Sequence, residues 1–221
     1  MDNLLLRREK ERERIIEVTA IERLWWTIEK KYINSEEALK AVSRDEMVVM
    51  PRYGNGYRLI SILDGKEGNE SNLIRKVVFY FISEVFSTWH SRLLEEDKNI
   101  YLAITSLCRS LADQIKINKS SDSYRSTDGT MSSHIAGASF DVSMRSYYCY
   151  EDNQWKPIRS WQSGEKELFR KQPIQLFLEI LDFQEAKNNC NVVIEKDISE
   201  SGAFDSVIHV CVNPDYEHTV Y

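Results

Sequence analysis

The sequence predicts an α+β fold: an antiparallel sheet packed by helices, with an N-terminal helical extension. This prediction rests on the order of the elements, which is helices, a hairpin, a helix, strands, a helix and strands. It also rests on size, because 221 residues fit one medium domain with a helical attachment and 42 % apolar residues suffice for a core. We place the extension at residues 1–46 and the main domain at 47–221.

The N-terminal extension is expected to be helical. Apolar residues at steps of three and four predict an amphipathic helix over about residues 4–31. The apolar positions are Ile15, Val18, Ile21, Leu24, Trp25 and Ile28. Asn34 followed by Glu37 predicts a second, short helix to about Val42. The mixed charges of residues 7–14 favour a solvated face, and a helix that binds a protein partner is the alternative.

The main domain is expected to begin with a hairpin. Residues 47–50 and 57–62 flank a turn that contains proline and glycine, so they are predicted to pair. Further helices are predicted at about residues 72–94, 111–117 and 173–187, the last with Pro173 in its first turn. Further strands are predicted at 101–105, after Gly137, and at 192–194 and 207–212. Residues 118–130 are expected to form a mobile surface loop next to the segment that follows it, residues 132–143.

Composition argues against several classes of protein. The net charge of −6 disfavours a nucleic-acid binder, which usually carries a basic surplus. No apolar run approaches the roughly 18 residues of a membrane span, and the first residues do not resemble a secretory signal. The protein is therefore expected to be cytoplasmic, or exported with a leader removed. The four cysteines lie far apart without a CxxC pair, which favours small buried residues over disulfides or a thiolate zinc finger.

Residues 132–143 carry the most informative pattern. After Gly137, apolar and polar residues alternate, which predicts a strand with Asp141 on its polar face. A tight hairpin turn at Gly137 would place His134 directly opposite Asp141, and a looser turn hinged at Gly137 would serve as well. An imidazole nitrogen and a carboxylate oxygen could then both reach one cation.

His209 is a candidate third ligand. It interrupts the apolar run of residues 207–212, and an imidazole in the middle of such a strand needs a polar partner or a metal. The chain has only four histidines. Of the other two, His90 is predicted to be packed or at the surface, and His218 to be exposed.

These residues resemble the zinc signature of the D-Ala-D-Ala carboxypeptidase and dipeptidase superfamily, whose fold is shared by Hedgehog signalling domains and murein endopeptidases. The signature is Ser-x-His-x-x-Gly-x-Ala-x-Asp with a distal His. The chain matches it with Ser132, His134, Gly137, Asp141 and His209, and departs from it with Ser139 in place of Ala. Residues 105–109 are similar to the family's Thr/Ser-x-x-Arg segment. The resemblance covers about residues 47–213 and is nearest to an uncharacterised bacterial branch.

The resemblance implies a zinc metallopeptidase of the carboxypeptidase or endopeptidase type, acting on peptidoglycan stem peptides or a related small peptide. His134, Asp141 and His209 would hold Zn²⁺, and water in the open fourth place would be activated near neutral pH. Residues 47–221 would then be a zinc peptidase-like domain. A module that holds zinc without hydrolysis, for binding or regulation, is the alternative.

The resemblance also suggests residues that bind substrate. Arg109 would stabilise the oxyanion, with a surface salt bridge as the alternative. Ser132 and Gln114 would contact substrate, and Ser132 could instead orient a ligand.

The general base is the open part of the site, because Ser206 occupies the place where the family usually has a carboxylate. Asp205 and Glu195 are the candidates, with Asp205 slightly favoured. Asp205 would share the His209 face but lie about 13 Å away unless a bulge shortens the strand. His218 is the third candidate, since some relatives use a second histidine.

Overall fold

The computed structural model describes residues 17–26, 35–60, 72–109, 111, 132–159, 172–197 and 205–217, and all structural statements below concern these residues. Helices and strands are both present, so the predicted α+β class is confirmed. The helices are α2 (Ser35–Ser43), α3 (Lys76–Arg92), α6 (Gln172–Ala186) and a further helix at residues 17–26.

The main sheet has seven strands in the order β2-β3-β5-β6-β9-β8, with β7 paired to β6. Its strands are β2 (Tyr53–Gly54), β3 (Tyr57–Leu59), β5 (Ile100–Ser106), β6 (Ser139–Glu151), β7 (Gln154–Arg159), β8 (Cys190–Asp197) and β9 (Asp205–Val212). A separate small sheet pairs β1 (Met47–Val49) with β4 (Leu73–Arg75). Because β3 runs parallel to β5, the main sheet is mixed, and the prediction of a purely antiparallel sheet is wrong at this pair.

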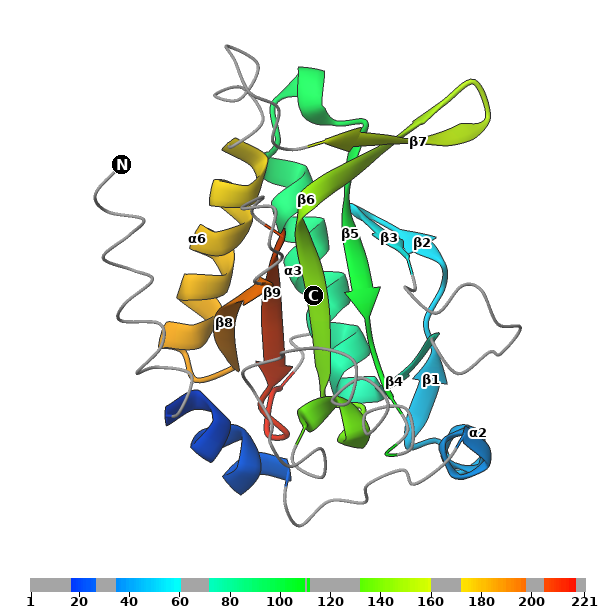
Figure 1. Ribbon diagram of the computed structural model, residues 1–221, viewed down its shortest axis with the longest axis vertical. Helices are drawn as coiled ribbons and strands as arrows, with labels where there is room; N and C mark the ends of the chain where they lie inside the picture. The colour runs from blue at the N-terminus through cyan, green and yellow to red at the C-terminus, as the bar shows by residue number, and fades with distance from the viewer. Residues whose placement is uncertain are drawn as a thin grey trace.

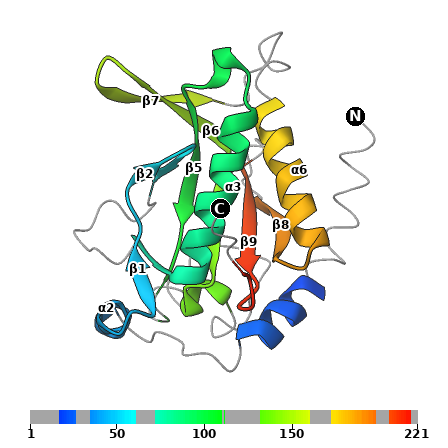
Figure 2. The same cartoon turned by 180° about the vertical axis from the view of Figure 1, so that it is seen from behind.

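Helices α3 and α6 pack side by side against one face of the sheet, which lies behind them in Figure 2. Alternating residues of β6 and β9, such as Phe140 and Val210, enter the core with the aromatic side chains of these helices. The Nε1 of Trp89 in α3 donates to the carbonyl of Pro173 at 2.7 Å and ties α3 to the start of α6. Since strand side chains alternate, the adjacent pairs Ser139–Cys211 and Asp141–His209 point to the opposite face.

The 17–26 helix packs at the end of the sheet where β6 begins, as the blue helix at the lower end of Figure 1 shows. Its contact face consists of Val18, Glu22 and Trp26, which are 3 to 5 % exposed. Ile21 and Leu24 are 38 % and 76 % exposed, so the prediction that they belong to the buried stripe is wrong. The Trp26 indole helps to hold this face against the sheet, because its Nε1 donates to the carbonyl of Val212 at 3.0 Å.

The predicted hairpin between residues 47–50 and 57–62 is wrong. β1 pairs instead with β4, which forms from the first residues of the predicted 72–94 helix. The hairpin that does form is the short one between β2 and β3, closed by a turn in which Gly56 has a φ of 83°. Pro51, which has no N–H to donate, separates this hairpin from β1.

The other predicted elements in the described residues are present as α2, α3, β5, β6, α6, β8 and β9. The predicted helix over 4–31 is confirmed at residues 17–26, and its remaining residues lie outside the described ones. β7 was not predicted, and it follows β6 through a tight turn at Asp152 and Asn153, both with positive φ. The predicted helix at 111–117 and loop at 118–130 lie outside the described residues, apart from Leu111. The boundary between residues 46 and 47 remains a prediction.

All four cysteines are described, and each is a buried thiol that forms no disulfide, as the sequence predicts. In the described part of the chain, no helix combines the length and the apolar character that crossing a membrane requires.

Candidate metal centre

Three predicted ligands meet at the sheet face that points away from α3 and α6. His134 lies in η4 (Ser133–Ala136), a 3₁₀ helix before β6, and Asp141 lies in β6. His209 lies in β9 directly opposite Asp141 in the antiparallel register. All three are buried, at 3 %, 6 % and 2 % exposure.

The turn before β6 brings His134 to the centre in a way that differs from the predicted hairpin. Residues 133–136 coil into η4, which ends at Gly137 in the left-handed conformation with φ 66°. The Arg75 side chain holds this turn from β4, because its Nε donates to the carbonyl of Ala136 at 2.7 Å. The hairpin is therefore wrong, and the looser turn hinged at Gly137 is the arrangement found. The position opposite Asp141 belongs to His209.

The three donor atoms form a nearly equilateral triangle. His134 Nε2 is 3.1 Å from Asp141 Oδ1 and 3.2 Å from His209 Nδ1, and these last two atoms are 2.9 Å apart. With metal–donor bonds of about 2.0–2.1 Å, neighbouring donors lie about 2.8–3.0 Å apart around an octahedral ion and about 3.3–3.4 Å apart around a tetrahedral ion. This buried His-Asp-His group could therefore hold a metal ion.

Each ligand is oriented by a partner on its far side. Nδ1 of His134 lies 2.7 Å from the carbonyl oxygen of Leu107. Because a carbonyl only accepts, Nδ1 carries the proton and Nε2 presents its lone pair to the centre. Asp141 Oδ2 accepts from Nη2 of Arg109 at 2.9 Å. His209 Nε2 lies 3.4 Å from Oε1 of Glu22. Such outer partners fix the tautomer and direction of metal ligands.

The protonation states suit a cation. Burial lowers the pKa of His134, which favours the neutral imidazole near pH 7. Burial alone would raise the pKa of Asp141, but the imidazoles of His134 and His209, when they are protonated, outweigh it and hold that pKa well below its usual value, so the carboxylate stays ionised. A neutral imidazole beside a carboxylate is the form that binds a metal ion.

Arg109 is fixed beside Asp141. Its Nε donates to Ser106 Oγ at 2.8 Å, its Nη2 donates to Asp141, and its backbone N–H donates to the carbonyl of His134 at 3.1 Å. The Arg109 side chain is 19 % exposed, so the ion pair is largely buried rather than at the surface. The oxyanion role of Arg109 remains a prediction.

Sequence reasoning missed Glu22, Ser133 and the use of Ser139. Ser139 Oγ donates to Ser133 Oγ, which donates to Glu22 Oε2 at 2.9 Å. Ser139 is thus the departure from the family motif that joins this network. The sequence does indicate the position of Glu22, because it lies four residues from both Val18 and Trp26. This spacing places its carboxylate on the same face of the helix as these two apolar residues.

The backbone register bears on the two candidate bases. The β8–β9 pairing is unbroken from Cys190–Val212 to Asp197–Asp205, so no bulge brings Asp205 nearer to His209, four residues and about 13 Å along the strand. Glu195 pairs with Val207, diagonal to His209 and about 7–8 Å from it. The backbone of Asp205 is therefore far from His209, and the backbone of Glu195 is closer to His209 than that of Asp205.

Ser132 immediately precedes η4 and is half-buried, and its carbonyl accepts the Ile135 N–H at 3.1 Å. This position is next to the centre, and the predicted contact with substrate is untested. Gln114 and His218 lie outside the described residues.

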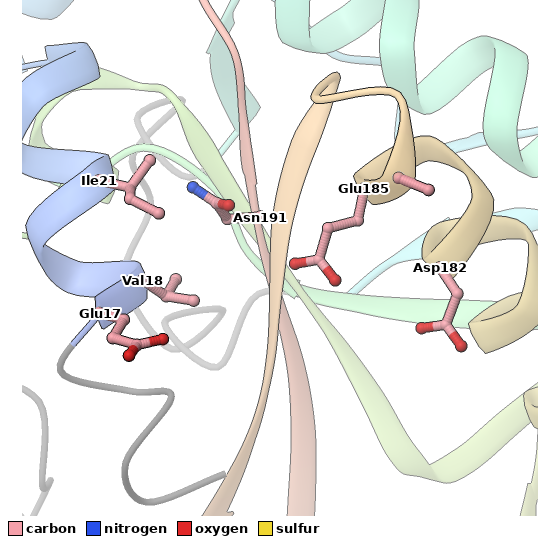
Figure 3. A pocket seen from close by; sticks show the side chains of 7 residues that line it. Glu17, Val18, Ile21, Asp182, Glu185 and Asn191 are labelled. Carbon is pink, nitrogen blue, oxygen red and sulfur yellow. The ribbon is translucent and has the colours of Figure 1, made fainter. Parts of the chain in front are cut away.

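A hollow of about 380 Å³ lies between the 17–26 helix and α6. Figure 3 shows the Asn191 amide between the two helices, with Glu17 on one side and Glu185 on the other. The lining residues are Glu17, Val18, Ile21, Asp182, Glu185, Ala186 and Asn191. Of the predicted site residues that the structure describes, neither the three ligands nor Arg109 nor Ser132 lines this hollow.

The resemblance to the carboxypeptidase and dipeptidase superfamily rests on the motif residues of the centre. No family model matches the chain, and neither a curated protein nor a solved structure matches it.

Proposed function

We propose that the protein is a zinc-dependent peptidase that hydrolyses a peptide bond in peptidoglycan stem peptides or a related small peptide. The observation that carries this proposal is the donor set of two imidazoles and one carboxylate, with donor atoms 2.9–3.2 Å apart. Structural zinc sites usually have four protein ligands, whereas catalytic sites have three and leave one position to water or substrate. In the described residues, the group has three members.

Zinc is proposed because of the motif rather than because of the distances. Two histidines and one carboxylate also bind Fe²⁺ in some oxygenases, and the donor spacing suits either ion. The motif residues Ser132, His134, Gly137 and Asp141, together with His209, support zinc through their resemblance to the peptidase signature. A metal panel therefore belongs to the test.

The chemistry requires stabilised charge and a proton donor. Zinc, when bound, polarises a peptide carbonyl and lowers the pKa of water. Arg109 would hold the negative charge that develops on the carbonyl oxygen, and its bonds to Ser106 and Asp141 orient the guanidinium beforehand. The leaving amine needs a proton from a nearby carboxylic acid. The register supports Glu195 ahead of Asp205 for this role.

A module that holds the metal without hydrolysis is the second candidate. The observation that favours it is burial, because the three ligands are only 2 to 6 % exposed. Such a centre could stabilise the fold rather than receive a substrate. The two functions share the metal and differ only in turnover.

The test combines metal analysis with a digestion assay. Metal-free protein is offered zinc, iron and manganese in turn, dialysed, and measured by elemental analysis. We expect about one zinc per chain in the wild type and in a His90→Ala control, and loss of zinc in His134→Ala and His209→Ala. Purified sacculi are then incubated with each protein, and the products are identified by mass spectrometry.

The outcomes separate the possibilities. Products that appear only with the zinc-loaded wild type and the control support the peptidase. Stoichiometric zinc without products supports the non-hydrolytic module. Preference for iron, or full zinc retention in either ligand variant, contradicts the proposal.

A further inference from the structure

We propose that Glu22 is a positioning residue of the metal centre, which orients His209 from the 17–26 helix and thereby couples docking of this helix to metal loading. This inference rests on the proposed metal site and deepens it. It assigns a role to a part of the chain that the motif does not include.

The contacts of Glu22 point to the centre. The residue is 5 % exposed, although carboxylates are rarely buried without a specific partner. Its Oε2 accepts from Ser133 Oγ at 2.9 Å, and its Oε1 lies 3.4 Å from His209 Nε2. Ser139 Oγ donates to Ser133 and completes the chain of hydroxyls that holds the carboxylate. Ser133 is thus the direct partner of the carboxylate, and its Oγ also lies 3.5 Å from His209 Nε2, so Glu22 and Ser133 both face this nitrogen.

The orientation of the His209 ring explains what the carboxylate does. Nδ1 of His209 faces the donors of the centre, at 2.9 Å from Asp141 Oδ1, so Nε2 is the nitrogen that remains for an outer partner. A cation at Nδ1 makes the N–H at Nε2 more positive, and a carboxylate there strengthens the imidazole as a ligand. Histidine ligands in metalloproteins commonly have such a carboxylate partner.

The helix that carries Glu22 is also anchored by Trp26, which packs against Ala136, Ala138 and Cys211 and lies against the Arg75 guanidinium. Val18 and Trp26 flank Glu22 on the docking face, and the Trp26 indole donates to the carbonyl of Val212. A metal that strengthens the contact between His209 and Glu22 therefore holds the helix in place. By linkage, docking of the helix strengthens metal binding by the same factor.

Two variants on the helix test the inference. Glu22→Gln keeps the shape and removes the charge, and Glu17→Gln is the matched control, because Glu17 is exposed on the same helix. Zinc affinity is measured by competition with a chromophoric chelator. We expect Glu22→Gln to weaken it about 10–100-fold, the usual effect of losing an outer partner of a ligand, and Glu17→Gln to leave it unchanged. The visible spectrum of the Co²⁺-loaded protein should shift in Glu22→Gln alone.

The coupling has its own measurement, which needs no substitution. Hydrogen exchange of the amides in residues 18–26 should slow when zinc is added to the metal-free wild type, and this protection should be lost in Glu22→Gln. Should Glu22→Gln not fold, Ser139→Ala releases the carboxylate indirectly and should weaken zinc binding in the same direction.

The results distinguish this inference from the proposed function. Equal zinc affinity and an equal Co²⁺ spectrum in wild type and Glu22→Gln overturn the inference and leave the metal site standing. Absence of zinc-dependent protection in the wild-type helix overturns the coupling. A wild-type protein that binds no metal overturns both.

Discussion

Replacing His134 by alanine separates two contributions to stability that meet at one side chain. The imidazole is 3 % exposed, its Nδ1 donates to the Leu107 carbonyl at 2.7 Å, and its Nε2 is one of the three donors of the centre. The metal-free variant therefore loses a buried hydrogen bond. When zinc is added, the variant also lacks the stabilisation that metal binding gives the wild type.

The size of both losses follows from these contacts. Leaving a buried carbonyl without its donor costs about 1–3 kcal/mol. A cavity of roughly 60 Å³ adds about 1.5 kcal/mol at about 24 cal/mol per Å³. For a chain of this length each kcal/mol lowers Tm by about 2–4 °C, so Tm of metal-free His134→Ala should fall by about 5–18 °C. Zinc at 100 times its Kd stabilises the wild type by about 2.7 kcal/mol, or about 5–11 °C, and this increment should vanish.

Thermal unfolding followed by circular dichroism, in chelator and in excess zinc, measures both losses. His90→Ala is the matched control, because His90 Nε2 also bonds a backbone carbonyl, that of Lys98 at 2.8 Å, outside the centre. The control should lose some stability and keep the whole zinc increment. A zinc increment that survives in His134→Ala would refute the assignment of Nε2 as a ligand.

Three further predictions concern neighbouring features. Arg109→Ala removes the donor that holds Asp141 Oδ2, so zinc affinity, measured by chelator competition, should be about 10–100-fold weaker. Arg109→Lys should restore only part of this affinity, and equal affinities in the wild type and Arg109→Ala would contradict the orienting role. Burial lowers the pKa of His134, so the unfolded chain takes up the proton first, and metal-free protein should lose stability as pH falls below the ordinary value of 6.5. Unfolding at pH 8 and pH 5.5 measures this, and His134→Ala should respond less. Trp89→Ala should lower the free energy of unfolding by about 3–5 kcal/mol, because the indole is fully buried and donates to the carbonyl of Pro173. Urea unfolding measures this loss, and a loss below about 1 kcal/mol would mean that the α3–α6 core relaxes around the gap.

Local patterns predicted the elements whose signals are local. The alternation around His209 identified β9, and the proline at position 173 identified the first turn of α6. Strand pairing was predicted poorly, because β1 finds its partner beyond residue 72 and β3 pairs in parallel with β5. The residues of a three-residue strand do not specify such distant partners, since several short apolar runs compete for each edge.

The sequence identified those residues of the centre that are polar where their neighbours in the strand are apolar. His209 in an apolar strand and Asp141 on the polar side of another both indicated a shared polar site. The path by which His134 arrives was not predictable, because whether residues 133–136 form a 3₁₀ turn depends on Arg75, which comes from a different strand. Glu22 was missed for a similar reason: its contacts come from how the helix docks on β6 and β9.

The spacing of the ligands along the chain has a consequence for the kinetics of folding. His134 and His209 are 75 residues apart and meet only because β9 aligns with β6. Before that pairing, only His134 and Asp141 lie close enough to bind the metal ion together. Binding of the third donor, His209, is then opposed by the entropy lost in closing the chain between them. Interactions that form after the transition state act mainly on the reverse reaction. Zinc should therefore lower the unfolding rate far more than it raises the folding rate, because it binds only after the sheet has formed.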